Sequence, residues 1–210
     1  NLDILASLRG SPELLLDLVD QPAEIERLSR QLTGLWLRYY DEQEALIRQA
    51  CRGTSCWTPL WSTGRTYMLQ SDFSYMISPA MLERFVLPDL AACCAHLDHA
   101  FYHLDGKGQI PHLEMLLSLP RLRGIQWIPG DGQPPPDRWL DLLGRIRDGG
   151  KLCQIFVTPE GALRVVRNLG GKGFLLCIEG YGPEFRDPGQ VEAFLGTLAR
   201  EDVSLRRTCF

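Results

Sequence analysis

Three side chains capable of metal-binding or acid–base chemistry stand at the ends of two strand-like runs. Asp72 follows the apolar run 67–70, and His103 and Asp105 close the run that begins at residue 100. Side chains two residues apart on an extended segment point to the same side. His103 and Asp105 can therefore hold a divalent metal with a third ligand such as Glu179 or Asp72, or act as an acid–base pair. The structural alternative is a hydrogen-bonded core histidine and an aspartate that caps the next helix.

Further polar and aromatic residues stand at the ends of other strand-like runs. We predict that Ser71, Gln126, Trp127 and Tyr181 bind the substrate. Glu179 is the predicted third metal ligand beside His103 and Asp105. Asp72 is predicted to be catalytic together with that pair, and the alternative is a loop carboxylate.

The order of the predicted elements sets where these residues lie. Five short apolar runs alternate with helical periods, which is typical of a parallel sheet with crossover helices. The predicted strands are residues 67–70, 100–104, 124–128, 151–157 and 173–178. The predicted helices are residues 22–50, 79–94, 110–119, 137–146, 159–169 and 188–200. Ser78 and Thr158 are predicted N-caps because each precedes a proline at the first helical position.

The fold class that fits this order is α/β of the (β/α)8 barrel type. A doubly wound sheet also fits the alternation, but no G-x-G-x-x-G motif follows a predicted strand. A closed barrel needs eight strands, and its active site lies at their carboxyl ends. The three further strands would lie upstream or within residues 1–18. We therefore expect residues 1–210 to be one domain, the C-terminal portion of a barrel.

Composition excludes several classes of function. The formal net charge is −4 and 23% of the 210 residues are charged, so there is no basic patch typical of nucleic-acid binding. No apolar run is long enough for a membrane span. The seven cysteines form no paired or metal-binding pattern. We expect a cytoplasmic protein that acts on a small molecule, without nucleic acid or membrane as a partner.

Two segments resemble a known family. Residues 76–88, Met-Ile-Ser-Pro-Ala-Met-Leu-Glu-Arg-Phe-Val-Leu-Pro, are similar to the S-P-x-x-F/L-x-x-F-x-x-P segment of uroporphyrinogen decarboxylase and its cobalamin-dependent methyltransferase relatives. Residues 102–106, Tyr-His-Leu-Asp-Gly, resemble the H-x-C-G element that follows at the same distance. The resemblance extends over roughly residues 22–199 and implies a (β/α)8 barrel.

The resemblance implies two activities. One is methyl transfer between a corrinoid on a partner protein and a small acceptor, and the other is cofactor-free decarboxylation of a porphyrinogen-like substrate. In the thiol-methylating branch, the family's zinc ligands are the His and Cys of H-x-C and a later Cys. This sequence keeps His103 but has Asp105 and Tyr181 at the cysteine positions. The ligand set is then His103, Asp105 and Glu179, or no metal is bound.

We expect an enzyme of the methyltransferase type. The alternatives are the decarboxylase and a catalytically idle barrel that serves as a binding protein. Five strand–helix units leave an open sheet edge, which we expect the missing strands or a second copy of the chain to cover as a homodimer.

Overall fold

The fold is mixed α/β, with a five-stranded parallel sheet flanked by helices. The computed structural model describes residues 1–179, 185 and 187–206. The strands of the large sheet follow the order β3-β4-β5-β6-β7. Their bounds are Thr66–Gln70 (β3), His99–Asp105 (β4), Leu122–Ile128 (β5), Leu152–Val157 (β6) and Phe174–Ile178 (β7). The α/β class and all five predicted strands are confirmed.

The chain divides into two compact units, Asn1–Gly124 and Ile125–Phe210, called unit 1 and unit 2 below. The helices of unit 1 are α1 (Leu2–Arg9), α2 (Ser11–Asp20), α3 (Pro22–Ile47), η1 (Asp72–Met76), α4 (Pro79–Phe85), α5 (Leu87–His96), η2 (Lys107–His112) and α6 (Leu113–Ser118). The described helices of unit 2 are η3 (Pro136–Arg138), α7 (Leu140–Asp148), α8 (Pro159–Asn168), α9 (Pro188–Glu201) and α10 (Val203–Arg206). No helix among these residues is both long and apolar enough to cross a membrane.

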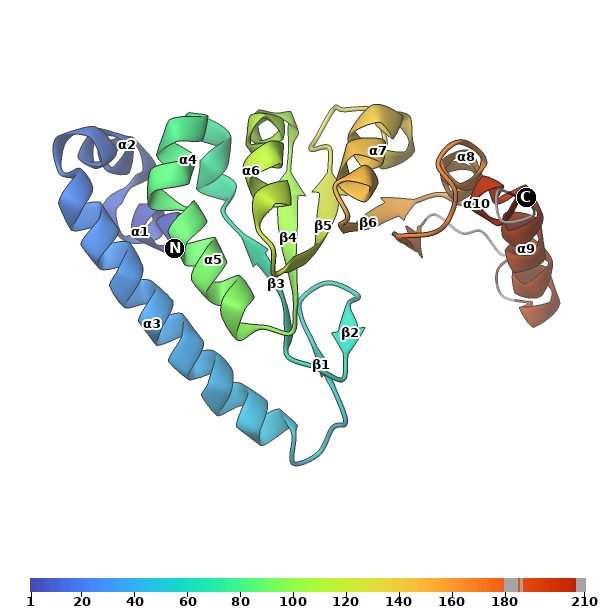
Figure 1. The fold of residues 1–210 in the computed structure, drawn as a ribbon, viewed down its shortest axis with the longest axis horizontal. Helices are drawn as coiled ribbons and strands as arrows, with labels where there is room; N and C mark the ends of the chain where they lie inside the picture. Colours follow the sequence, from blue (N-terminus) through green and yellow to red (C-terminus); the bar gives the residue numbers. More distant parts are fainter. Residues whose placement is uncertain (180–184, 186, 207–210) are drawn as a thin grey trace. The chain divides into compact units, whose positions relative to one another are not determined.

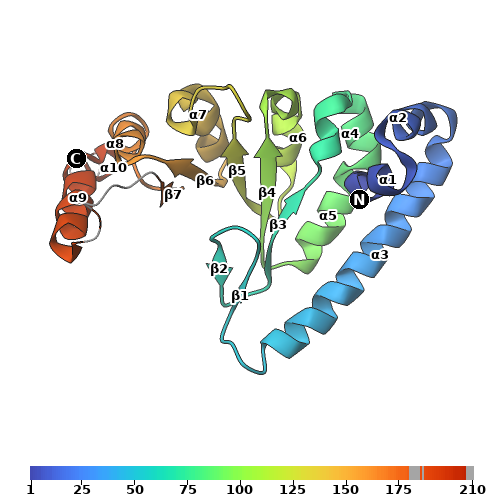
Figure 2. The ribbon, with the colours of Figure 1, turned by 180° about the vertical axis from the view of Figure 1, so that it is seen from behind.

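In unit 1, β3 and β4 pair in parallel, with Thr66 opposite His99 and Gln70 opposite His103. Figure 1 shows α5 and α6 in front of these strands, and Figure 2, turned by 180°, shows the strands in front of the same helices. Both helices therefore lie on one face of β3 and β4. Leu69, Tyr102 and Leu104 point to one face of the paired strands and are 6%, 0% and 0% exposed. Met68 and Phe101 point to the other face and are also buried, at 0% and 3%.

Residues 2–9 and 11–20 form the helices α1 and α2, so the alternative that residues 1–18 supply barrel strands is wrong. Leu2 and Leu5 of α1 and Leu14 and Leu18 of α2 are buried, at the three- and four-residue spacing of an amphipathic helix. The segment between α3 and β3 contains a small antiparallel pair, β1 (Thr54–Ser55) and β2 (Trp61–Ser62).

Three predicted helices are broken or begin later than expected. The helix predicted over residues 79–94 divides at Val86 into α4 and α5, because Pro88 has no N–H to donate and its ring favours a helix start. The helix predicted from residue 110 begins as the 3-10 turn η2, which contains Pro111, and becomes α-helical only at Leu113. The helix predicted from residue 137 becomes α-helical at Leu140. The N-caps are confirmed: Ser78 and Thr158 accept bonds from the N–H groups of Met81 and Gly161.

In unit 2, β6 and β7 pair in parallel, with Cys153 opposite Phe174 and Val157 opposite Ile178. The side chains of Ile155 and Val165 are 0% exposed, so the strand β6 and the helix α8 share a core. The strand β7 is less covered, since every residue in it is intermediate or exposed.

Candidate functional site

The parallel register of β3 and β4 brings the three predicted catalytic residues together. Gln70 pairs with His103, and Asp72 and Asp105 each follow two residues later. Asp72, His103 and Asp105 form a group in which one ligand atom from each lies within 4.8 Å of the others. We call these three residues the ligand group. The sequence-based expectation that strand ends gather them is met within unit 1.

The ligand group has the donor types of a divalent metal site. His103 Nε2 lies 3.8 Å from Asp105 Oδ2, and their side chains are 12% and 40% exposed. One imidazole nitrogen and two carboxylate oxygens suit zinc, manganese, iron or cobalt better than a soft thiolate-binding ion. The donor set therefore fits a metal, but not the thiolate-rich zinc set that the family resemblance implies.

Gly106 lets the chain turn directly after the ligand group. Its φ is 78°, a left-handed conformation that favours glycine. A Cβ atom there would lie 2.9 Å from the ring of Tyr75. Gly106 is also the N-cap of η2, which has no side-chain cap bond. The alternative in which Asp105 caps the following helix is thus not what the structure has.

Asp3, from α1, is a member of the site that sequence reasoning missed. Its carboxylate accepts the backbone N–H groups of Asp72 at 3.1 Å and Phe73 at 2.7 Å, which fixes the start of η1. Burial raises the pKa of Asp72, the charges of Asp3 and Asp105 raise it further, and His103 lowers it. A bound cation would offset the repulsion among these three carboxylates.

Two neighbours hold the ligand group in position. The Trp57 ring contacts the His103 ring edge-on, with 5.1 Å between the centroids. Trp57 Nε1 donates to the Met68 carbonyl at 3.2 Å, which ties the segment between β1 and β2 to β3. Gln70 Nε2 donates to Asp72 Oδ2 at 3.2 Å.

A buried polar layer lies next to the group. Ser71, predicted to bind substrate, is 1% exposed and its hydroxyl accepts a bond from Ser74 Oγ at 2.9 Å. His112 is buried, with Nε2 2.9 Å from the Ser74 carbonyl. The hydroxyl of Tyr102 donates to Gln109 Oε1 at 2.9 Å. Ser71 is thus placed to stabilise η1, where it is covered from solvent.

The remaining predicted residues belong to unit 2. Gln126 is buried and donates to Gln154 Oε1 at 2.9 Å. Trp127 is 0% exposed and packs edge-on against Trp139 at 5.1 Å, so it is a core residue of unit 2. Glu179 follows β7 in unit 2 and is exposed. Tyr181 lies outside the described residues.

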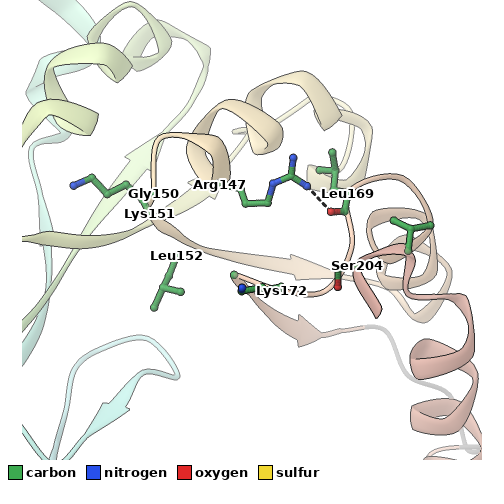
Figure 3. Close-up of a pocket in the computed structure, with 9 residues that line it drawn as sticks. Arg147, Gly150, Lys151, Leu152, Leu169, Lys172 and Ser204 are labelled. Carbon is green, nitrogen blue, oxygen red and sulfur yellow. Dashed lines mark hydrogen bonds between the residues drawn. The ribbon is translucent and has the colours of Figure 1, made fainter. Parts of the chain in front are cut away.

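Each unit has a cavity. In unit 1, a cavity of about 320 Å³ is lined partly by Asp3, Trp57 and Gln70, the neighbours of the ligand group. In unit 2, a cavity of about 340 Å³ lies before β6 and β7 (Figure 3). Its Arg147 is directed toward Leu169, whose carbonyl accepts a bond from the guanidinium, and Arg147 also pairs with Asp148 at 2.7 Å. The arginine is therefore used to hold unit 2 together.

A comparison of the sequence with models of protein families and with curated proteins found no match. The class is therefore defined by the fold and the geometry: a mixed α/β protein with a candidate metal-binding group at the carboxyl ends of two parallel strands.

Proposed function

We propose that the protein is a metal-dependent enzyme acting on a small molecule, with Asp72, His103 and Asp105 as the metal ligands. The observation that carries the proposal is the convergence of one nitrogen and two oxygen donors within 4.8 Å. Their position supports it, because the carboxyl ends of parallel strands are where α/β enzymes place their chemistry.

The residues around the group have separate roles in this proposal. The carboxylates of Asp72 and Asp105 supply oxygen donors, and the His103 ring supplies a nitrogen donor. Asp3 holds the backbone at Asp72, and Trp57 fixes the orientation of the His103 ring. A bound divalent ion supplies Lewis-acid activation, which lowers the pKa of a coordinated water or thiol.

The reaction that we propose is methyl transfer to a small acceptor, with the methyl group carried on a corrinoid of a partner protein. The support is the resemblance of residues 76–88 and 102–106 to the decarboxylase and methyltransferase family. In this transfer the carbon–cobalt bond would break and its electron pair would stay on the corrinoid, while the acceptor would lose its proton to solvent and form the new bond to the methyl carbon. A metal that favours the deprotonated acceptor would therefore favour the reaction. The arrangement of α5 and α6 on one face of β3 and β4 supports a barrel-type fold, in which the helices cover the outer face.

The experiment is an assay of methyl transfer from methylcobalamin to a panel of small thiols, read by mass spectrometry of the thioether. The protein is loaded with zinc, cobalt(II) or manganese(II) in separate assays. The test variant is His103→Ala. The matched control is His99→Ala, which removes the same side chain from the other end of β4.

We expect turnover in the wild type and His99→Ala, and its loss in His103→Ala. Equal turnover in both variants would exclude His103 from the reaction. If the protein takes up a metal but methylates none of the thiols, the metal-site proposal stands and the methyl-transfer proposal fails. That result would favour the decarboxylase or the catalytically idle binding protein.

A further inference from the structure

The cavity of unit 1 combines aromatic rings with carboxylates. Its aromatic lining consists of Trp36, Trp57 and Tyr67, and its acidic lining of Asp3 and Asp89. None of the described residues that line it is a lysine, an arginine or a histidine. Asn1 also lines it, and its α-ammonium acts on the neighbouring Cys93, so the two carboxylates leave the lining with a net negative charge. A cavity with negative charge and π-electron faces attracts a cation that also has apolar surface.

The aromatic residues are held in a fixed arrangement. Trp36 contacts Tyr67 edge-on with 5.4 Å between the centroids, and it stacks on Tyr40 at 5.3 Å. Trp57 is fixed from the other side by its bond to the Met68 carbonyl. Rings that are already ordered lose little entropy when a ligand binds, which favours affinity.

The two carboxylates come from different helices, and each has lone pairs that can still accept a hydrogen bond or contact a cation. Asp89 Oδ1, on α5, accepts one bond from Thr33 Oγ1 at 2.7 Å. Asp3, on α1, accepts one backbone bond on each of its two oxygens. A carboxylate has about four lone-pair sites, so each can still interact with a cation. Partial burial strengthens that interaction relative to bulk water.

We propose that this cavity binds a small organic cation of the methylated-ammonium class, with a body about the size of choline. The volume of about 320 Å³ lies at the lower end of the range, roughly 300–1,000 Å³, that is typical of small-molecule sites. A bare metal ion would leave the aromatic lining unused, and a neutral apolar ligand would gain nothing from the negative charge of the two carboxylates.

The cavity adjoins the ligand group, but the organic cation proposed for the cavity is independent of the metal proposed for the ligand group. Asp3, Gln70 and Trp57 line the cavity and also contact Asp72 or His103. The ammonium ligand would therefore lie beside the ligand group. Binding in the cavity requires neither a metal nor the reaction proposed above, so the two proposals can fail separately.

The test is isothermal titration calorimetry of the full chain, stripped of metal, with choline and with 3,3-dimethyl-1-butanol. The two ligands have the same shape, and only choline is charged. We expect choline to bind at least about tenfold more tightly, because the cation–π and carboxylate interactions act on choline alone. Equal binding of the two ligands, or no binding of choline, would overturn the proposal.

Variants localise the binding. Asp89→Asn removes a charge from the cavity, and Trp36→Leu removes a ring; each is expected to weaken choline binding about tenfold. The matched controls are Asp20→Asn and Trp61→Leu, whose residues are exposed outside the cavity. If circular dichroism shows that Trp36→Leu does not fold, the affinity of Asp89→Asn for choline decides whether the cavity is the binding site. Unchanged affinity in a folded Asp89→Asn would overturn the assignment of the site.

Discussion

The two units differ in which end of their strands has a distinctive set of side chains: the carboxyl ends in unit 1 and the amino ends in unit 2. In unit 1, Asp72, His103 and Asp105 lie at the carboxyl ends of β3 and β4. In unit 2, the cavity before β6 and β7 is lined by Arg147 and Lys172, and the arginine is engaged with Asp148 and the Leu169 carbonyl. This difference agrees with the general pattern of parallel (β/α) barrels. Their active-site residues lie at the carboxyl ends of the strands, and residues at the amino ends stabilise the fold.

The units also differ in how well their strands are covered, which gives the largest expected effect. Leu104 in β4 is 0% exposed, and Leu175 in β7 is 39% exposed. We predict that Leu104→Ala lowers the free energy of unfolding by about 2–5 kcal/mol, and Leu175→Ala by less than about 1 kcal/mol. Urea denaturation followed by circular dichroism measures both. A similar loss in the two variants would mean that β7 is covered in solution, for example by a second copy of the chain.

Helix caps provide a comparison in which the units should agree. Ser78 Oγ accepts from Met81 N–H at 3.3 Å in unit 1, and Thr158 Oγ1 accepts from Gly161 N–H at 3.1 Å in unit 2. Ser78→Ala and Thr158→Ala should each lower the free energy of unfolding by about 1 kcal/mol. Chemical denaturation of the pair checks this. No loss in one variant would show that its cap bond is not formed in solution.

β3 is an edge strand of the large sheet, and side chains bond to some of its carbonyl groups in place of a neighbouring strand. The hydroxyl of Tyr40 donates to the Thr66 carbonyl at 3.1 Å, and Trp57 Nε1 donates to the Met68 carbonyl. Tyr40→Phe should lower the free energy of unfolding by about 0.5–1.5 kcal/mol. The control is Tyr39→Phe, since Tyr39 is exposed on the same helix. Equal values for the two would contradict a bonded edge, and would favour its cover by an additional strand.

The smallest expected effect is the pH-dependent stability contributed by one surface hydrogen bond in unit 1. Asp98 Oδ2 accepts the Arg65 N–H at 2.9 Å, and this bond lowers the pKa of Asp98. Stability from a lowered pKa is present above the unfolded value and is lost as the pH falls through the folded value. Asp98→Asn should therefore lower the Tm slightly at pH 7, and the difference should vanish at low pH. A difference that stays constant with pH would contradict the assignment.

The strands, the two caps and the convergence of the ligand group followed from the sequence because their signals are local. Apolar runs mark β3 and β4, and a parallel register then fixes Asp72 beside Asp105. The division of residues 79–94 at Val86 also had a local signal, Pro88, which outweighs the apolar spacing around it.

The surroundings of the ligand group could not be predicted because they depend on tertiary contacts. Asp3 is 69 residues from Asp72 in the sequence, and no pattern in α1 marks it as a site residue. Trp57 reaches His103 from the segment between two strands of two residues each, too short for periodicity to show. Trp127 stands at a strand end as predicted, but packing inside unit 2 makes it a core residue.

The most direct test of the metal proposal is a titration of the metal-stripped chain with zinc, cobalt(II) and manganese(II) by calorimetry, with the bound metal counted by mass spectrometry. We predict one divalent ion per chain. His103→Ala should weaken binding by at least about 10–100-fold, the cost typical of disturbing even the outer partners of metal ligands. His99→Ala should bind as the wild type does. Failure of the wild type to take up any of the three ions, or equal binding by the two variants, would contradict a metal site at Asp72, His103 and Asp105.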